Sequence, residues 1–185
     1  MSLTIPFLRK PSPDFYFYVI AALDESGGIG KDGKIPWTLP DEMKYFRDVT
    51  RAHSRGRINA VVMGRNTWES LPDNFRPLPD RMNIVITSKP ESLPLGITSF
   101  PSFDKALEFL RTYWVNSIDD IFVIGGAQLY ATAVTRPECS SVFLSHVKGV
   151  YDCDTFFPRL DGCWIKVANE DKGGWTASVY SRRVK

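Results

Sequence analysis

The chain has 185 residues, of which 43% are hydrophobic and 24% charged, proportions typical of a soluble globular protein with one domain and a sizeable core. Its formal net charge of +2, carried by scattered Lys and Arg residues, does not favour nucleic-acid binding, and no apolar run approaches the roughly 20 residues that cross a bilayer. Three cysteines without a Cys-x-x-Cys spacing argue against a disulfide framework or a zinc site, so we expect a cytoplasmic protein with reduced thiols and no metal.

The first predicted elements are an N-terminal arm, a buried strand and a glycine-rich loop. Residues 1–14 contain two prolines after Arg9-Lys10 and lack a long apolar segment, so we expect a loose arm rather than a signal peptide, and a domain over residues 15–185. Residues 15–23 (FYFYVIAAL) indicate a central strand buried on both faces. The loop at residues 24–36 carries four glycines, so it can move and a ligand can approach its backbone closely.

A helix with a carboxylate among its apolar residues is predicted to begin at Pro40. Leu39, Glu42, Met43 and Phe46 have the i, i+3, i+4, i+7 spacing of one buried stripe, so Glu42 stands where a leucine would be expected. A buried carboxylate is costly unless it is paired, and its pKa then rises, which is typical of functional sites. The alternative is a helix turned slightly, so that Glu42 reaches water.

Short apolar strands alternate with helices through the rest of the chain. Further strands are predicted at residues 59–63, 82–87, 97–100, 121–124, 141–147, 164–168 and 176–180, the last two forming a hairpin turned at residues 172–174. Further helices are predicted at residues 65–71, 102–113 (with Ser102 as N-cap and Phe103, Ala106, Leu107 and Leu110 as its buried stripe) and 127–134. The fold class is therefore α/β. We expect a single-domain three-layer α/β/α protein with a central, mostly parallel eight-stranded sheet, an antiparallel C-terminal hairpin and about four helices.

Two strand-to-helix junctions are candidate anion sites. Gly64 precedes Arg65 at one of them, and Gly125-Gly126 ends a strand at the other. Backbone N–H groups at such junctions point outward, so two junctions suggest a ligand with two or more phosphates. Neither junction has the GxGxxG or Walker pattern, and either one alone is equally well explained as a tight turn that needs glycine.

Three further residue types were weighed for chemistry. Arg81 follows a proline-stiffened loop and could clamp a carboxylate in bidentate fashion, although a solvated surface arginine is the plainer interpretation. Trp37 is of a type found more often in a core than against a cofactor. His53 and His146 stand far apart in the sequence without metal ligands or a triad around them, so we assign them no chemistry.

Six segments in the same order resemble the dihydrofolate reductase family and extend over residues 15–180. GIGKDGKIPW resembles its mobile substrate loop, LPDEMKYF the helix with its active-site acid, and VVMGRNTWESLP its first cofactor segment. FRPLPDRMNIVITS resembles the stretch with its glutamate-binding arginine, IGGAQLY its second cofactor segment, and DTFFP a further signature.

The resemblance implies hydride transfer from NADPH to C6 of 7,8-dihydrofolate, with protonation of N5, to give 5,6,7,8-tetrahydrofolate for one-carbon metabolism and thymidylate synthesis. It also implies inhibition by antifolates such as methotrexate. Glu42 would hydrogen-bond the pterin and help protonate N5, Thr155 would support Glu42 directly or through water, and Trp37 would complete the catalytic set. Arg81 would clamp the α-carboxylate of the glutamate tail.

The same resemblance implies two sets of contacts. Substrate contacts are implied for Ile20, Ala22, Ile35, Glu42, Met43, Phe46, Thr67, Leu71, Leu78, Arg81 and Ile124. Cofactor contacts are implied for Ala22, Ile29, Gly30, Gly64, Arg65, Asn66, Thr67, Thr87, Ser88, Lys89, Ile124, Gly125, Gly126, Ala127, Gln128, Leu129 and Tyr130. A cis peptide is expected between Gly125 and Gly126.

Alternatives stay open at this point. Asn66 and Gln128 stand where members of the family carry basic residues, which leaves the strength of the preference for NADPH over NADH open. A riboflavin-pathway pyrimidine reductase shares the fold but would not need Glu42 and Arg81 in these places, and a non-catalytic nucleotide-binding module would need neither. We expect a monomer, unless the chain is a domain of a fusion with thymidylate synthase, as occurs in some protists.

Overall fold

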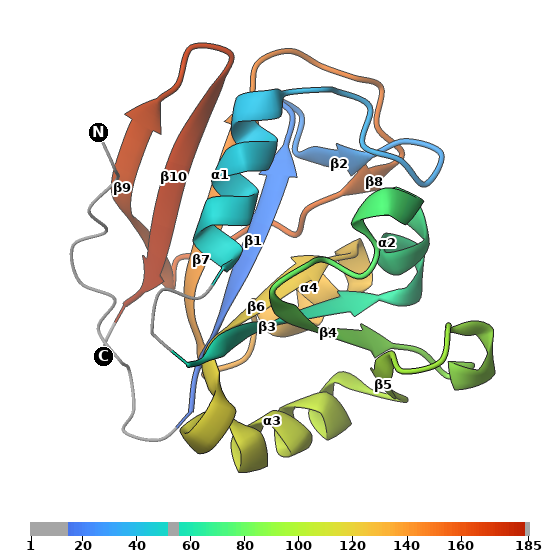
Figure 1. The fold of residues 1–185 in the computed structure, drawn as a ribbon. Helices are drawn as coiled ribbons and strands as arrows, with labels where there is room; N and C mark the ends of the chain where they lie inside the picture. Colours follow the sequence, from blue (N-terminus) through green and yellow to red (C-terminus); the bar gives the residue numbers. More distant parts are fainter. Residues whose placement is uncertain (1–14, 52–55, 184–185) are drawn as a thin grey trace.

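Eight strands form one twisted sheet, in the order β5-β4-β3-β6-β1-β7-β10-β9 (Figure 1). The computed structural model describes residues 15–51 and 56–183, so the N-terminal arm and His53 lie outside the described residues. The strands are β1 (Phe17–Leu23), β2 (Gly28–Gly30), β3 (Ile58–Gly64), β4 (Arg81–Ile86), β5 (Thr98–Phe100), β6 (Ile118–Gly125), β7 (Cys139–Val147), β8 (Thr155–Phe156), β9 (Trp164–Asp171) and β10 (Trp175–Arg182). The α-helices are α1 (Pro40–Thr50), α2 (Arg65–Ser70), α3 (Phe103–Ser117) and α4 (Ala127–Ala133).

The strand pairing confirms the predicted architecture. From β5 to β7 all neighbours are parallel, and β10 pairs antiparallel with both β7 and β9. Each of the eight predicted strands is present in this sheet. The short strands β2 and β8 were not predicted, and they form a separate antiparallel pair. Two single turns of 3-10 helix, Asp73–Phe75 and Pro90–Ser92, lie in the loops on either side of β4.

The central strand β1 is buried on both faces, as the sequence predicts. Phe17 and Val19 belong to a cluster on one face of the sheet, while Tyr18 and Ile20 belong to a cluster on the other. Successive side chains of a strand point to opposite faces, so an uninterrupted apolar run serves two cores at once. Helices α3 and α4 cover the first face, and α1 and α2 cover the second (Figure 1).

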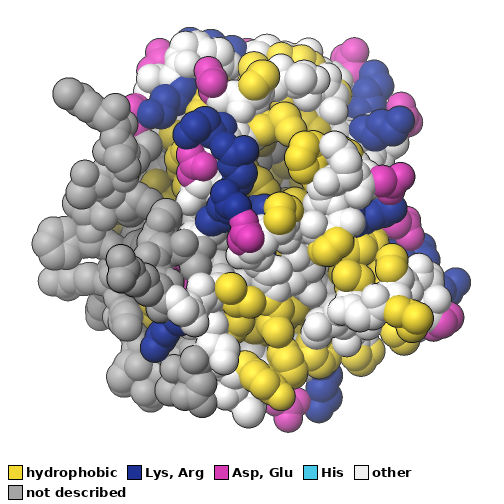
Figure 2. Space-filling model, in the orientation of Figure 1, with side chains coloured by type: hydrophobic (Ala, Val, Ile, Leu, Met, Phe, Trp, Pro, Cys, Tyr) yellow, Lys and Arg dark blue, Asp and Glu magenta, His cyan; other side chains and the backbone are white. Residues whose placement is uncertain are grey.

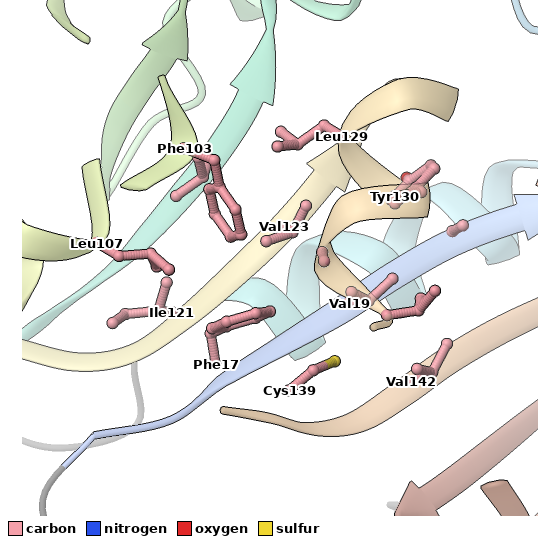
Figure 3. Packing of buried hydrophobic residues seen from close by; sticks show 14 of the residues in the cluster. Phe17, Val19, Phe103, Leu107, Ile121, Val123, Leu129, Tyr130, Cys139 and Val142 are labelled. Carbon is pink, nitrogen blue, oxygen red and sulfur yellow. The ribbon is translucent and has the colours of Figure 1, made fainter. Parts of the chain in front are cut away.

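The first cluster shows why α3 lies where it does. Phe103 and Leu107 project from α3 toward the sheet (Figure 3), and Leu110 belongs to the same buried cluster. Phe17 and Phe103 meet edge to face with their ring centroids 5.3 Å apart. Ser102 caps this helix by accepting a hydrogen bond from the backbone N–H of Lys105 at 3.3 Å. The predicted stripe and N-cap of α3 are therefore confirmed.

The buried stripe of α1 differs from the predicted one. Met43 is 53% exposed, whereas Tyr45, Phe46 and Val49 pack against the second cluster. The stripe thus begins at Glu42 and continues at i+3, i+4 and i+7, instead of beginning at Leu39. Tyr45 packs against Trp175 of β10 with ring centroids 5.1 Å apart and the rings tilted by 52°. A stripe moved by three residues corresponds to a helix turned by roughly 60° from the predicted orientation.

Candidate active site

The carboxyl ends of the parallel strands bring the two predicted anion junctions together. Met63 of β3 lies opposite Gly125 of β6, and Gly64 lies opposite Ile86 of β4. Because these strands are parallel, their ends meet at one edge of the sheet, where ligands of open α/β sheets bind. Met63 and Gly125, which are 62 positions apart in the sequence, therefore belong to one candidate site at this edge.

Glu42 is a buried carboxyl group in the first turn of α1. It is 8% exposed, and removal from water raises its pKa above the ordinary value. The hydroxyl of Ser145 on β7 faces it and lowers this pKa, which partly opposes the effect of burial. Ser145 Oγ is itself buried and makes no hydrogen bond of regular geometry with any described residue. The predicted burial of Glu42 is confirmed.

Ser145, which was not predicted for the site, is a residue that faces Glu42. The support of Glu42 by Thr155, directly or through water, stays a prediction. Thr155 lies on β8, opposite Gly30 of β2, and its Oγ1 donates to Oδ1 of Asp154 at 2.8 Å. Ser145 instead lies in the main sheet, between Ala22 of β1 and Ala177 of β10. The available signal was one small polar residue inside the apolar strand VFLSHV, but which strand passes under α1 depends on the tertiary fold.

The lid loop, residues 28–37, lies against the segment before and within β8. Gly30 O accepts a hydrogen bond from Asp154 N at 3.0 Å, and Asp32 N donates to Asp154 Oδ2 at 2.8 Å. Trp37 packs edge to face on Tyr151 with ring centroids 5.3 Å apart, in a small cluster that also holds Val147 and Ala22. Trp37 therefore packs the lid loop against Tyr151. Its catalytic role, which the family resemblance implies, stays a prediction.

The residues predicted to contact the substrate fall into two groups. One group is buried in or packed against the second cluster: Ile20, Phe46, Leu71, Leu78 and Ile124. The other group is exposed, with Ile35 at 62% and Met43 at 53%. In the space-filling view, hydrophobic side chains reach the surface between α1 and α2, beside Lys and Arg side chains (Figure 2). The first group therefore belongs to the core, whereas the second group is open to solvent.

Arg81 is held at the start of β4 by neutral partners. Its Nη1 donates to Thr50 Oγ1 at 2.8 Å, and its Nε donates to the carbonyl of Pro79 at 3.0 Å. Burial, with the charges of Arg51 and Arg47, lowers its pKa to about 10, so it stays charged at neutral pH. Within residues 15–51 and 56–183 no carboxylate forms an ion pair with Arg81, although Arg51 pairs with Asp80. The site therefore holds an oriented positive charge suited to a carboxylate.

The glycine junctions fit a dinucleotide phosphate. The Gly125–Gly126 peptide is cis, as expected. A Cβ atom at Gly125 would lie 2.6 Å from Thr67 Oγ1, and one at Gly64 would lie 3.6 Å from the backbone N of Gly126. The Thr67 side chain therefore leaves no room for a side chain at Gly125, whereas a Cβ atom at Gly64 would be in ordinary contact. Helix starts of this kind have backbone N–H groups without helical partners, which suit phosphate oxygens.

The remaining residues predicted to contact the cofactor differ in how exposed their side chains are. Arg65 forms an ion pair with Glu69 at 3.5 Å, and the buried Thr87 accepts the N–H of Lys89 at 3.0 Å, so the start of the loop after β4 is ordered. Exposed side chains are those of Asn66, Ser88, Lys89 and Gln128. Leu129 and Tyr130 are buried, and Tyr130 Oη donates to the carbonyl of Ile20 at 2.8 Å. Any contact of these last two residues with a cofactor thus rests on their backbone.

Other features of the described residues carry no chemistry. A hollow of about 90 Å³ lies between the start of α1 and the β9–β10 turn, lined by Leu39, Pro40, Asp41, Lys172, Gly174 and Trp175. It is too small for a folate, and none of its residues was predicted for the site. No group of three His, Cys, Asp or Glu side chains in the described part of the chain is placed to hold a metal ion. None of the described helices is long and apolar enough to cross a membrane.

Comparison with known proteins agrees with the geometry. The family model described as "Dihydrofolate reductase" matches residues 16–180. The dihydrofolate reductase of Heliothis virescens is 40% identical over 159 residues, covering 83% of this chain and 85% of that protein. The bifunctional dihydrofolate reductase-thymidylate synthase of Daucus carota is 41% identical over 159 residues, covering 83% of this chain but 30% of that protein.

A solved structure extends the agreement to three dimensions. Schistosoma mansoni dihydrofolate reductase superposes with a TM-score of 0.80 at 34% sequence identity, covering 92% of this chain and 100% of that one. With a buried acid, an oriented arginine and two glycine junctions at one sheet edge, the chain belongs to the dihydrofolate reductase family.

Proposed function

We propose that this protein is an oxidoreductase that reduces 7,8-dihydrofolate to 5,6,7,8-tetrahydrofolate with NADPH, in support of one-carbon metabolism. The observation that carries the proposal is Glu42, a carboxyl group with a raised pKa beside the edge where the glycine junctions meet. NADPH supplies the hydride when bound. The residues of this chain bind the two molecules, exclude water from them and provide the proton.

Glu42 is the group that handles the proton. A carboxyl group in an apolar site is a useful acid near neutral pH because its proton is retained at a higher pH than in water. Its carboxylate also provides two acceptor oxygens for the amino group and the ring N–H of the pterin. The Ser145 hydroxyl lowers the pKa of this acid. The apolar side chains of Ile20 and Phe46 keep the reacting ring away from bulk water.

Arg81 binds the tail of the substrate. Its remaining guanidinium N–H groups donate to a carboxylate in bidentate fashion, and Thr50 and Pro79 fix the plane in which that carboxylate must lie. Thr50 is anchored in turn, since its hydroxyl donates to the carbonyl of Phe46 at 2.8 Å. The helix that carries the acid therefore also positions the arginine.

The residues at the ends of β3, β4 and β6 would hold the cofactor. Gly64, Thr67 and Gly126 provide the pyrophosphate cradle, and Arg65 with Lys89 provides the positive charge for the 2′-phosphate that distinguishes NADPH from NADH. Ala22, Ile29 and Gly30 face the nicotinamide end. These roles follow from the positions of the residues at one sheet edge and from the family, and they set the subsites tested below.

One assay separates the candidate functions. Purified protein is incubated with NADPH and dihydrofolate, and the loss of NADPH absorbance is followed with and without methotrexate. Turnover that methotrexate abolishes supports the proposal. A pyrimidine reductase would act only on a ribose-phosphate pyrimidine and would ignore methotrexate, and a non-catalytic module would bind NADPH without consuming it.

Assembly and location complete the proposal. We expect a monomer in solution unless the chain is part of a longer protein fused to thymidylate synthase, and light scattering of the purified chain measures this directly. We place the protein in the cytoplasm, supported by three cysteines that are all free thiols.

A further inference from the structure

Asp24 is a buried carboxylate without an assigned role. It follows β1 directly and is 1% exposed. Its Oδ1 accepts hydrogen bonds from the backbone N–H of Ser26 at 2.9 Å, the Ser26 hydroxyl at 2.7 Å and the backbone N–H of Gly28 at 2.8 Å. Its Oδ2 accepts the backbone N–H of Tyr151 at 2.9 Å and faces the Cys153 thiol at 3.7 Å.

These bonds connect two segments that are far apart in the sequence. The Oδ1 bonds hold the start of the lid loop, and the Oδ2 bonds hold the facing segment, residues 149–156. Among the described residues Asp24 forms no ion pair, so neutral donors alone stabilise its charge. These hydrogen bonds lower its pKa against the effect of burial, so it remains ionised and can only accept.

The packing at Gly28 makes the connection tight. A Cβ atom at Gly28 would lie 2.3 Å from Cys153 Cβ and 3.1 Å from Asp24 Oδ1, so only glycine fits between them. Backbone bonds run alongside, from Glu25 N to Gly149 O at 3.0 Å and from Phe157 N to Gly27 O at 2.9 Å. The start of the lid loop is thus fixed to the sheet.

The middle of the same loop is exposed, and besides its own turn it is tied to the facing segment by the bond from Asp32 N to Asp154 Oδ2 at 2.8 Å. Lys31, Gly33, Lys34 and Ile35 are exposed, and the Lys31–Lys34 bridge closes the turn on itself. The loop therefore has a fixed base at residues 28–30 and an exposed tip at residues 31–35. A lid of this form can move at its tip only, while its base keeps one position against β8.

We propose that Asp24 is a positioning residue for hydride transfer: by joining the loop after β1 to the facing segment, it fixes Ile29 and Gly30 against the nicotinamide end of the cofactor. The inference rests on the proposed function only for the assignment of Ile29 and Gly30 to the nicotinamide. The connection itself, from Asp24 to Gly28 and Tyr151, does not depend on that assignment.

The test compares Asp24→Asn with Asp152→Asn in the full chain. Asn keeps the shape but turns an N–H₂ group toward either Gly28 N–H or Tyr151 N–H, which places donor against donor. Asp152 lies in the same facing segment, but its side chain is 89% exposed and its Lys31 partner is 4.0 Å away, so its variant is the matched control. For each protein we measure amide exchange at Gly28 and Tyr151, the KM values for NADPH and dihydrofolate, and the isotope effect with NADPH deuterated at the transferred hydrogen.

We expect Asp24→Asn to raise the amide exchange rates of Gly28 and Tyr151 by roughly tenfold, because a charge-assisted hydrogen bond is lost. For the same reason the KM for NADPH should rise by roughly tenfold. The isotope effect should increase as hydride transfer becomes slower, with little change in the KM for dihydrofolate. The control should match wild type. Equal changes in both KM values, with no change in isotope effect, would mean general destabilisation and would overturn the proposal.

Two safeguards keep the result decisive. If Asp24→Asn does not fold, Ser26→Ala, which removes only the 2.7 Å hydroxyl donor, must give the same pattern to a smaller degree, and unchanged exchange at Tyr151 in that variant overturns the proposal. If wild type shows no turnover of dihydrofolate, the proposed function fails, whereas the exchange at Gly28 and Tyr151 still decides whether Asp24 joins the two segments.

Discussion

The hydroxyl of Ser145 on β7 faces the carboxyl group of Glu42 on α1, so a residue of the sheet acts on the acid that the helix carries. The two residues are 103 positions apart in the chain, since 145 minus 42 is 103. Ser145 lowers the pKa of Glu42 while burial raises it, so the strength of the acid is set by two opposed effects.

Glu42→Gln should abolish most of the turnover at neutral pH while NADPH binding persists. Glutamine matches the side chain in size but cannot deliver the proton, and general acid catalysis typically contributes about a hundredfold or more. Turnover is measured in the NADPH assay, and binding by the quenching of tryptophan fluorescence. Asp41→Asn, an exposed neighbour in the same helical turn, is the control. Unchanged turnover in Glu42→Gln would remove this residue from the mechanism.

Ser145→Ala should move the pH profile of turnover to higher pH. Proton delivery requires the protonated carboxyl group, so the rate falls as the pH rises through the pKa of Glu42. Removing the hydroxyl removes the interaction that lowers this pKa, so the fall occurs at higher pH. Ser141→Ala, on the same strand and also buried, is the control because its hydroxyl lies near Ser181 at 3.4 Å instead. A shift to lower pH, or the same shift in both variants, would contradict the assignment of Ser145.

Glu42 should also make folding stability depend on pH. Its pKa is raised in the folded state, so between the ordinary carboxyl pKa and the raised value the folded state binds more protons than the unfolded state. Stability therefore decreases as the pH rises through this window, and the full cost of the buried charge is present above it. Glu42→Gln should flatten this dependence and be the more stable protein above the window. Urea unfolding across mildly acidic to neutral pH measures the effect, and parallel curves for the two proteins would refute it.

Arg81→Leu should weaken binding of dihydrofolate and methotrexate by roughly a hundredfold and leave NADPH binding intact. The expected loss is that of a charge-assisted bidentate pair in a half-buried site. Titration of each ligand separately gives the result, with the exposed Arg57→Leu as control. If NADPH binding were lost and methotrexate binding retained, the two subsites would be assigned the wrong way round.

Gly125→Ala should destroy NADPH binding and lower stability. The new Cβ would lie 2.6 Å from Thr67 Oγ1, and the φ of +144° is one that other residues rarely adopt. We expect a loss of about 2 kcal/mol or more in the free energy of unfolding. Gly162→Ala is the matched control because no atom lies within 4 Å of its Cβ position. Equal stability in the two variants would show that the cradle has more room than the contacts indicate.

The local sequence pattern was enough to predict much of this fold, because buried strands are continuous apolar runs. The apolar run of β1 predicts that this strand is buried, and Gly64 predicts where β3 ends. Both predictions are confirmed. The orientation of α1 was missed because Tyr45 gains its place from Trp175, a residue 130 positions further along. Ser145 was missed for the same reason, because the strand that passes under α1 is decided only in the folded chain.

The enclosure of β1 also limits how this site can change under selection by an inhibitor. Ile20 is 2% exposed between two packed layers, so a larger or smaller residue there disturbs the core as well as the ligand, at about 1–3 kcal/mol. Ile35 and Met43 are exposed, so a substitution at either residue leaves the core packing unchanged. A resistance substitution at Ile35 or Met43 would therefore cost little stability, whereas one at Ile20 would need a second, stabilising substitution elsewhere to persist.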